Sequence, residues 1–401
     1  MIRFDELSKL NLMNFFLNLY FLLPVSVFFY QQRGLDYFQI LALESILVLF
    51  VFIFEVPTGM FADKYGRKKS IVLGSLLSAI APIIFIFANN YLWFGIGFAI
   101  GGLAITFHSG TIEAFIYDYL KSKKQEKNMK KAMGSFNSAS LIALVIAPII
   151  GSYIGRDLLM NQFVFLLIMT GSAAIFGFII SLLIKDTKRK KIPNQNPFIF
   201  VKNGLKLLGK NKYLIRIVLL SMFASPFVYV ISYLYQPYLQ NSSVNPAIFG
   251  TIFAIAILFA ALLQKYAYKF EEKLGVRRAV FIATILPGIL YILMAIIVHP
   301  IVAILLFILL RGTMGLQDPL FSDYKNIHIP SNIRATMLSL ISMITGIYVI
   351  FARLVVGKLA DINLSYSFLF MGIVIITAAI FLRINENHVK IKSRFKSVQS
   401  S

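Results

Sequence analysis

The sequence predicts an all-α polytopic membrane protein with twelve transmembrane helices, arranged as two pseudo-symmetric six-helix bundles with both termini cytoplasmic. Apolar runs of about 17 to 25 residues recur along almost the entire chain, and this is the length that a helix needs to cross a bilayer. Hydrophobic residues make up 58% of the 401 residues, and charged residues only 14%. The composition therefore leaves little of the chain for a water-soluble domain.

The apolar runs place the expected helices in order along the chain. We expect them at residues 10–30, 40–61, 70–88, 91–120, 132–154, 162–184, 213–235, 246–264, 279–298, 301–324, 334–356 and 365–382. No small-residue cleavage site follows the first run, which predicts a retained span and not a signal peptide. Cysteine is absent, which excludes disulfides, thiolate metal sites and cysteine nucleophiles.

Basic residues predict the orientation of the chain in the cell (inner, cytoplasmic) membrane. Lysine and arginine gather in alternate connections, at residues 64–69, 121–131, 185–212, 265–278 and 383–396. With the N-terminus inside, these stretches all face the cytoplasm, and the opposite side keeps mainly Arg33, Arg156 and Lys358, as the positive-inside rule requires. The net charge of +22 then lies beside lipid headgroups, so we expect membrane lipids and not nucleic acid as its partners.

A polar and basic stretch at residues 185–212 divides the chain. It predicts an N-terminal six-helix bundle at 1–184, a cytoplasmic central linker at 185–212, and a C-terminal six-helix bundle with a basic cytoplasmic tail at 213–401. Pro193 and Pro197 interrupt any helix in the linker. Residues 198–208 are apolar and lysine-rich enough to lie on the inner membrane surface.

The most informative stretch is a charged, glycine-containing turn at residues 55–69. Seven positions match the pattern Gly-x-x-x-Asp-Arg/Lys-x-Gly-Arg-Arg/Lys-Arg/Lys, namely Gly59, Asp63, Lys64, Gly66, Arg67, Lys68 and Lys69. The stretch resembles the signature loop between the second and third helices of the major facilitator superfamily of secondary transporters. A weaker copy lies 209 residues later, at residues 272–275 followed by Arg277 and Arg278. The copy predicts two parallel halves.

The resemblance implies transport by alternating access, in which two bundles rock around a central site. It also implies a conformational latch on the cytoplasmic side, formed by Gly59, Asp63, Lys64, Gly66, Arg67, Lys68 and Asp118. We expect Asp63 to accept hydrogen bonds at the N-terminus of the helix that begins near Arg334. We expect Arg67 to pair with Asp118.

Small residues and a proline characterise the helix expected at 132–154. Ala147, Gly151 and Gly155 lie four residues apart, and Pro148 follows the first of them. They resemble a Gly-Pro-rich motif of antiporters in this superfamily, although Ala147 and Ser152 stand where glycines are usual. Small residues let helices approach closely, and the proline bends the helix. The motif favours export, and a helix kinked for packing alone is the alternative.

Ionisable side chains in the expected spans are the candidates for proton coupling. The Arg-x-x-Gln-Gly pattern usual in proton-coupled members is missing, and the helix at 91–120 offers His108 and Glu113 instead. Such groups face a cavity or a partner helix, so Glu113 is either a proton or cation site or an acid hydrogen-bonded to a neighbouring helix. Glu55 is a further candidate, either as a structural acid or as a titrating group.

Arg311, Asp318, Arg353 and Tyr233 are the candidates for lining a substrate cavity in the second half. A buried arginine without a counter-charge is strongly destabilising, so each arginine is expected to have a carboxylate or a substrate as its partner. Arg311 and Asp318 are seven residues apart and share a face of the expected helix. They therefore either pair with each other or leave Arg311 to bind an anion.

Together these patterns predict a secondary active transporter for proton-coupled efflux of small amphipathic molecules or drugs. We expect a monomer whose ligands are a small-molecule substrate and protons. The alternatives are proton-coupled uptake or facilitated transport of a specific small metabolite, and a lipid flippase on the same fold. No Ser-His-Asp or metal-ligand cluster recurs at useful spacing. We therefore expect neither an enzyme nor a metal site, and no cofactor, with the proton gradient as the energy source.

Overall fold

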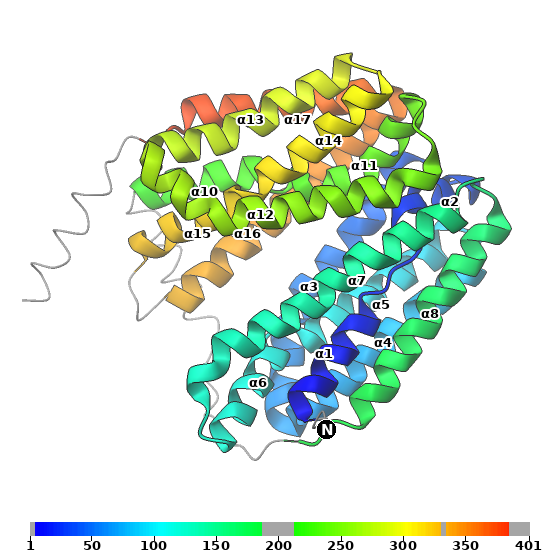
Figure 1. Cartoon of the computed structure of the whole chain (residues 1–401), viewed down its shortest axis with the longest axis vertical. Coiled ribbons are helices and arrows are strands. Elements are labelled where there is room, and N and C mark those ends of the chain that lie inside the picture. The colour runs from blue at the N-terminus through cyan, green and yellow to red at the C-terminus, as the bar shows by residue number, and fades with distance from the viewer. Residues whose placement is uncertain (1–4, 187–211, 330–333, 385–401) are drawn as a thin grey trace, which may run out of the picture. The chain divides into compact units, whose positions relative to one another are not determined.

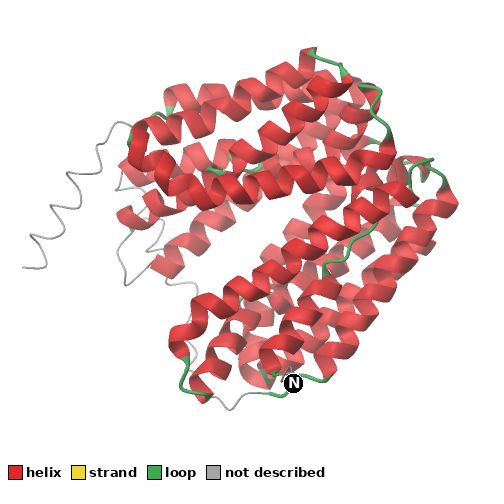
Figure 2. Cartoon of the chain, viewed as in Figure 1, coloured by secondary structure: helices red, strands yellow, loops and turns green. Residues whose placement is uncertain are grey.

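The computed structural model describes residues 5–186, 212–329 and 334–384, which form helices and connecting turns without a β-strand (Figures 1 and 2). Within these residues, eleven segments are long and apolar enough to cross a membrane. The predicted all-helical membrane fold is therefore confirmed, whereas the cytoplasmic location of the termini stays a prediction. Most of the expected linker, including its surface segment at 198–208, and most of the basic tail lie outside the described residues.

The N-terminal half forms helices that follow one another with short connections. They are α1 (Glu6–Leu17), η1 (Leu23–Val25), α2 (Ser26–Gln32), α3 (Tyr37–Tyr65), α4 (Arg67–Phe87), α5 (Tyr91–His108), α6 (Thr111–Ser122), η2 (Glu126–Asn128), α7 (Met129–Ile154) and α8 (Met160–Leu182). Apolar side chains of α1, α4 and α6 meet in a buried core around Leu10, Ile71 and Phe115. Burial of such side chains is what holds these helices together within the unit.

The C-terminal half repeats this order. Its helices are α10 (Lys212–Ala224), α11 (Phe227–Asn241), η3 (Pro246–Ile248), α12 (Phe249–Leu274), α13 (Val276–Ile296), α14 (Pro300–Gly315), α15 (Gln317–His328), α16 (Arg334–Ile362) and α17 (Leu364–Phe381). Adding 209 to the residue numbers that bound α4 gives the bounds of α13. Adding 209 to the bounds of the span Tyr37–Tyr65 likewise gives those of the span Pro246–Leu274. The helix boundaries thus show the internal repeat that the two motif copies predict.

The first apolar run is interrupted and is not among the eleven spans. In place of one helix at 10–30, α1 ends at Leu17 and α2 begins at Ser26, with η1 between them. Pro24 has no backbone N–H and cannot continue the hydrogen-bond ladder of a helix. The N–H of Phe21 donates instead to Thr170 Oγ1 of α8 at 3.1 Å. The broken backbone is therefore satisfied inside the protein, as it must be at membrane depth.

Breaks occur at equivalent places in both halves. The first and fourth spans are divided, at α1/α2 and α5/α6 in the N-terminal half and at α10/α11 and α14/α15 in the C-terminal half. Discontinuous helices leave backbone polar groups and side chains available at membrane depth, where transporters place their binding sites. The breaks therefore indicate where a functional site is built.

The charged stretch at residues 55–69 is mostly helical and is not the turn that the sequence predicts. α3 continues to Tyr65 and α4 begins at Arg67, so only Gly66 separates them. Gly66 has a φ of 117°, a conformation that favours glycine and redirects the chain within one residue.

The second copy of the motif has the same backbone geometry. Gly275 has a φ of 75° and separates α12 from α13. Gly66 and Gly275 each donate their N–H to the carbonyl four residues before, at 3.1 and 2.8 Å. Their carbonyls accept from the N–H four residues later, at 3.2 and 2.9 Å. Both copies therefore need a glycine for the same reason.

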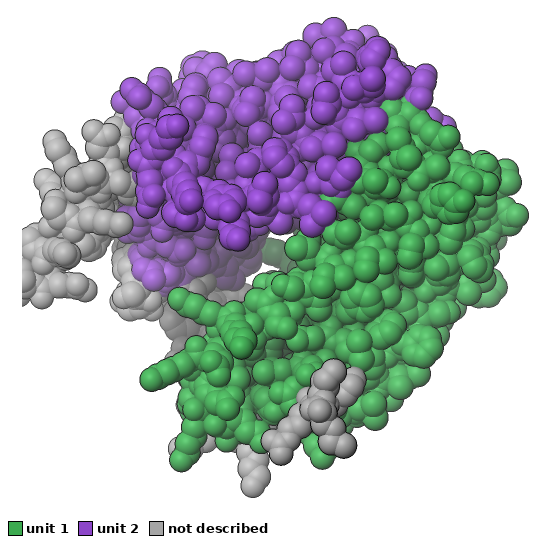
Figure 3. Space-filling model, viewed as in Figure 1, with its two compact units in different colours: residues 1–194, 244–254 green, residues 195–243, 255–401 purple. Residues whose placement is uncertain are grey.

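The helices group into two compact units (Figure 3). Unit 1 comprises residues 1–194 and 244–254, and unit 2 comprises residues 195–243 and 255–401. The first turn of α12 belongs to unit 1 because it meets α7 there. Ser152 Oγ donates to the carbonyl of Ala247 at 3.0 Å, and a Cβ on Gly250 would collide with the carbonyl oxygen of Pro148.

Candidate functional site

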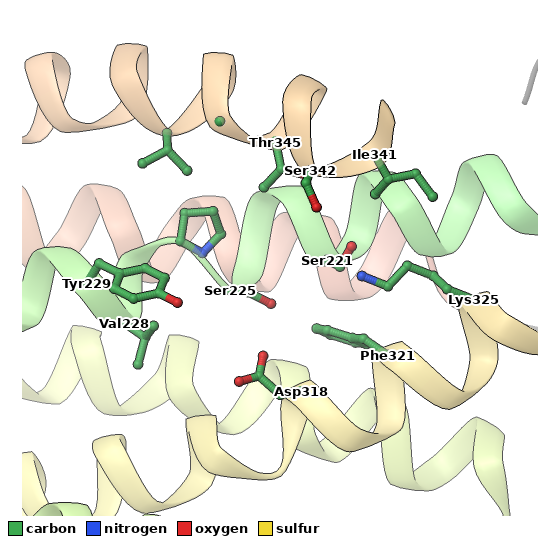
Figure 4. A pocket seen from close by; sticks show the side chains of 13 residues that line it. Ser221, Ser225, Val228, Tyr229, Asp318, Phe321, Lys325, Ile341, Ser342 and Thr345 are labelled. Atoms are coloured by element: carbon green, nitrogen blue, oxygen red, sulfur yellow. The ribbon is translucent and has the colours of Figure 1, made fainter. Parts of the chain in front are cut away.

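Unit 2 contains a cavity of about 370 Å³ among α10, α11, α15 and α16 (Figure 4). This volume is in the range of small-molecule sites. Its charged lining residues are Asp318 and Lys325, its hydroxyl groups come from Ser221, Ser225, Tyr229, Ser342 and Thr345, and its apolar side chains include Val228, Phe321, Ile341 and Val349. The lining can therefore contact an apolar body and polar groups of one ligand at the same time.

The break between α10 and α11 supplies one wall of this cavity. Pro226 has no N–H, so α10 ends at Ala224 and α11 begins at Phe227. Ser221 begins the last turn of α10, Ser225 directly follows the helix, and both line the cavity. The broken first span of this half thus provides hydroxyl groups at membrane depth.

α15 supplies the charges. Asp318, Phe321 and Lys325 are spaced by three and four residues, which places them on one face of the helix. All three side chains line the cavity (Figure 4). They belong to the segment Pro300–His328, which is apolar enough to cross a membrane. Charged groups within such a segment are costly and mark functional positions.

Arg311 does not share this cavity. The seven-residue spacing predicts that Arg311 and Asp318 lie on one face, but α14 ends at Gly315 and α15 begins at Gln317. The break puts the two residues on different helices, and no salt bridge joins them among the described residues, although the two charges still act on each other through space. Arg311 Nη1 instead donates to the carbonyl of Val228 at 3.0 Å. The charge that faces the cavity together with Asp318 is Lys325.

The other predicted cavity residues lie elsewhere in unit 2. Arg353 is buried on α16, with 4% of its surface exposed, and Tyr233 is half-buried on α11. Neither lines the 370 Å³ cavity. Their contribution to a substrate site stays a prediction.

Several lining residues were not expected from the sequence. Lys325 lies one residue beyond the helix expected at 301–324, although its place seven residues after Asp318 could have signalled a shared face. The sequence gives no sign that a cavity is lined by Ser221, Ser225, Ser342 and Thr345, because serine and threonine are common in membrane helices. Only the packing of α10, α15 and α16 identifies them as neighbours of the two charges.

In unit 1, Arg67 joins the signature stretch to α6. Its guanidinium forms an ion pair with Asp118 and also donates to the carbonyl of Ala114. The two charged side chains are only 12% and 17% exposed, so their charges compensate each other in a largely dry environment. The structure thus brings together the two residues that the sequence pairs.

The remaining residues of the expected latch make few contacts within unit 1. Asp63 and Lys64 are exposed in the last turn of α3, and Lys64 Nζ lies 5.1 Å from the ring centroid of Tyr65. Lys68 is half-buried at the start of α4, and a Cβ on Gly59 would meet no atom within 4 Å. The contact expected between Asp63 and the helix that begins at Arg334 stays a prediction.

The three candidates for proton coupling surround the break between α5 and α6 without forming one site. His108 Nε2 lies 3.2 Å from the carbonyl of Ile71 on α4. Glu55 Oε1 accepts a hydrogen bond from Ser109 at 3.3 Å. Glu113 is exposed in the first turn of α6, where the helix dipole favours an acid. His108 and Glu113 therefore point to different surroundings.

The motif on α7 forms a packing face within unit 1. Ala147 and Pro148 are buried, and a Cβ on Gly151 would collide with the carbonyl oxygen of Phe21 in the break of the first span. Gly155 lies against Val25, whose Cγ2 would be 3.0 Å from an added Cβ. The small residues thus allow α7 to approach a broken helix closely.

Two helical halves with equivalent broken spans, and a cavity lined by charges at membrane depth, define the class of polytopic membrane transporters. The family model described as Major Facilitator Superfamily matches residues 10–330 and 218–398. The chain belongs to this family.

Relatives and solved structures agree with this assignment. An uncharacterized MFS-type transporter of Bacillus subtilis (strain 168), YxaM, is 25% identical over 382 residues, which cover 92% of this chain and 94% of YxaM. Multidrug resistance protein 2 of the same organism is 23% identical and covers 79% of each chain. The crystal structure of the nucleoside transporter NupG (D323A mutant) matches with a TM-score of 0.78 and 16% identity, over 94% of this chain and 97% of NupG. At that identity the likeness shows the fold alone.

Proposed function

We propose that this chain is a proton-coupled exporter of small amphipathic molecules. One observation carries the proposal: Asp318 is an acidic side chain exposed to a small-molecule cavity inside a membrane-spanning segment. An ionisable group in that position is by default part of a proton or ion path. Of the three acids Glu55, Glu113 and Asp318, only Asp318 lines this cavity and can meet a ligand there.

The carboxylate of Asp318 explains exchange of a proton for a substrate. A proton and the cationic end of a substrate compete for the single negative charge of this group. A substrate therefore leaves when a proton arrives, and the proton leaves when the next substrate binds. Because a ligand shifts a conformational equilibrium only by its differential affinity for two states, this competition links the proton gradient to alternating access.

The lining of the cavity favours amphipathic molecules. Phe321, Ile341 and Val349 offer apolar contact, and Asp318 offers a charge within the same small volume. A separate observation supports export, namely the similarity over most of the chain to a relative named multidrug resistance protein 2.

Uptake of a specific polar metabolite is the second candidate. The observation that favours it is the set of hydroxyl groups in the lining, because convergent hydrogen-bond donors give specificity to a binding site. Export and uptake differ in whether the substrate moves against or with the proton, so the direction of transport decides between them.

Transport of ethidium, a cationic amphipathic dye, into everted membrane vesicles tests the proposal. We expect respiring vesicles that contain the protein to accumulate the dye, and a protonophore to abolish the accumulation. Asp318→Asn should reduce the rate to that of vesicles without the protein. Asp323→Asn is the matched control, because Asp323 is exposed on the same helix but does not line the cavity, and it should transport normally.

Two outcomes would contradict the proposal. Undiminished accumulation with Asp318→Asn would remove Asp318 from the coupling path, and the same assay with Glu113→Gln would then test the other candidate. Proton-driven efflux from the vesicles would favour uptake in cells.

A further inference from the structure

The two charges in the cavity of unit 2 lie at opposite ends of one helix face. Asp318 and Lys325 are separated by seven residues of α15, which corresponds to about 10 Å along a helix axis. Phe321 lies between them and lines the same cavity. A ligand that lies along this face therefore meets an acid, an aromatic ring and an amine in that order.

Each charge also has its own hydroxyl neighbour. The carboxylate of Asp318 is directed towards Ser225, and the amine of Lys325 towards Ser221 (Figure 4). No ion pair joins Asp318 to Lys325 among the residues that the structure describes. The two groups act on each other through space, and Arg311 also acts on Asp318, but neither group is held in a direct contact that would prevent it from binding a complementary charge.

We propose that this cavity selects dipolar molecules that carry a cationic group and an anionic group on either side of an apolar segment. The cationic group would contact Asp318, the anionic group Lys325, and the apolar segment Phe321. The proposal rests on the proposed function, since it names the substrate class for the same cavity. The inference goes beyond the proposed function, because competition between a substrate and a proton requires only Asp318.

The lining binds molecules with one charge more weakly than dipolar molecules, so a cation such as ethidium is accepted but is not the preferred substrate. A cation alone brings no counter-charge to the ammonium of Lys325, and an anion alone brings none to the carboxylate of Asp318, so each loses one of the two favourable charge contacts. In a zwitterionic lipid headgroup only two methylene groups separate the phosphate from the amine, so its charges are too close together to match a face on which Phe321 separates the two groups. A dipolar aromatic compound satisfies both charges and the ring.

Three related probes test the inference by titration calorimetry on the purified full-length protein. 4-(Aminomethyl)benzoic acid carries opposite charges across an aromatic ring, its methyl ester is a cation, and 4-methylbenzoic acid is an anion. We expect the zwitterion to bind at least about tenfold more tightly than either singly charged probe, since tenfold corresponds to about 1.4 kcal/mol.

Substitutions should separate the two ends of the site. Asp318→Asn should weaken binding of the zwitterion and of the cation but not of the anion. Lys325→Gln should weaken binding of the zwitterion and of the anion but not of the cation. The exchange Asp318→Lys with Lys325→Asp should restore binding of the zwitterion in the reverse orientation, which a purely structural role of the two residues would not do. Asp323→Asn should leave all three affinities unchanged.

The outcomes are distinct. Three results would overturn the inference, provided that the variants remain monodisperse on gel filtration. They are equal affinities for the three probes, no binding of any probe, and weakened binding of the zwitterion that the exchange of the two residues does not restore. If proton-driven ethidium transport persists alongside such a result, the proposed function stands and only the substrate class is wrong. Selective binding of the zwitterion, together with no proton-driven transport of either ethidium or the zwitterion, would support the binding site but contradict the proposed exporter.

Discussion

At the scale of single residues, the ion pair of Arg67 with Asp118 shows how a largely buried charge is stabilised. Removing one partner leaves the other charge desolvated and unpaired. We therefore expect Asp118→Asn to lower the stability of the protein by about 1–3 kcal/mol, the usual cost of an unsatisfied buried group.

Thermal unfolding of the purified protein in detergent measures this loss as a lower midpoint. The double variant Arg67→Gln with Asp118→Asn removes both charges and should be less destabilised than the sum of the single variants, because the residues interact directly. Strict additivity would show that the pair contributes nothing.

Asp63 illustrates the opposite case, a residue whose charge does not serve helix stability. It is exposed in the last turn of α3, where the negative end of the helix dipole disfavours a carboxylate by about 0.3–1 kcal/mol. Asp63→Asn should therefore leave the unfolding midpoint unchanged or slightly higher, while the rate of dye transport falls because the latch is lost. Normal transport by this variant would exclude the latch.

At the scale of secondary structure elements, the approach of α7 to the broken first span depends on Gly151. An added methyl group would meet the carbonyl oxygen of Phe21, and backbone cannot move aside as a flexible side chain can. We expect Gly151→Ala to destabilise the protein by about 1–3 kcal/mol, as overpacking does.

Gly134 provides the matched control on the same helix. A Cβ there meets no atom within 4 Å, so Gly134→Ala should be neutral or stabilising by up to about 1 kcal/mol through helix propensity. Unfolding midpoints of the two variants therefore move in different directions. Equal midpoints would mean that the close approach of α7 does not matter for stability.

At the scale of the whole molecule, the distribution of basic residues predicts the orientation in the membrane. The chain has no cysteine, so single cysteines can be labelled without background. Lys123→Cys lies in the basic connection between α6 and α7, and Asn89→Cys lies between α4 and α5. Both positions are exposed, and with the N-terminus inside they lie on opposite sides.

A membrane-impermeant maleimide applied to right-side-out vesicles checks this prediction. Asn89→Cys should react at once, and Lys123→Cys only after the vesicles are permeabilised. Immediate labelling of Lys123→Cys together with protection of Asn89→Cys would invert the topology and, with it, the direction assigned to transport.

The sequence by itself determined the helical membrane class, most of the spans and the family. These follow from local properties, because the length of an apolar run sets whether a helix can cross the bilayer. For example, the helix expected at 162–184 is α8, at Met160–Leu182. The sequence also indicated the positions of the glycines in both motif copies, because a positive φ restricts the residue type at a single position.

The tertiary structure decided which prolines break a helix, since Pro24 and Pro226 do and Pro57 does not, and it decided which side chains share a cavity. The first span divides where Thr170, distant in sequence, accepts the freed N–H of Phe21. Ser221 and Lys325 become neighbours only through the packing of α10 against α15. Because α14 ends before Asp318, the charged residue that lines the cavity together with Asp318 is Lys325 and not Arg311. A hydropathy pattern records how apolar each helix is but not which faces meet, so such sites become visible only when the helices are packed.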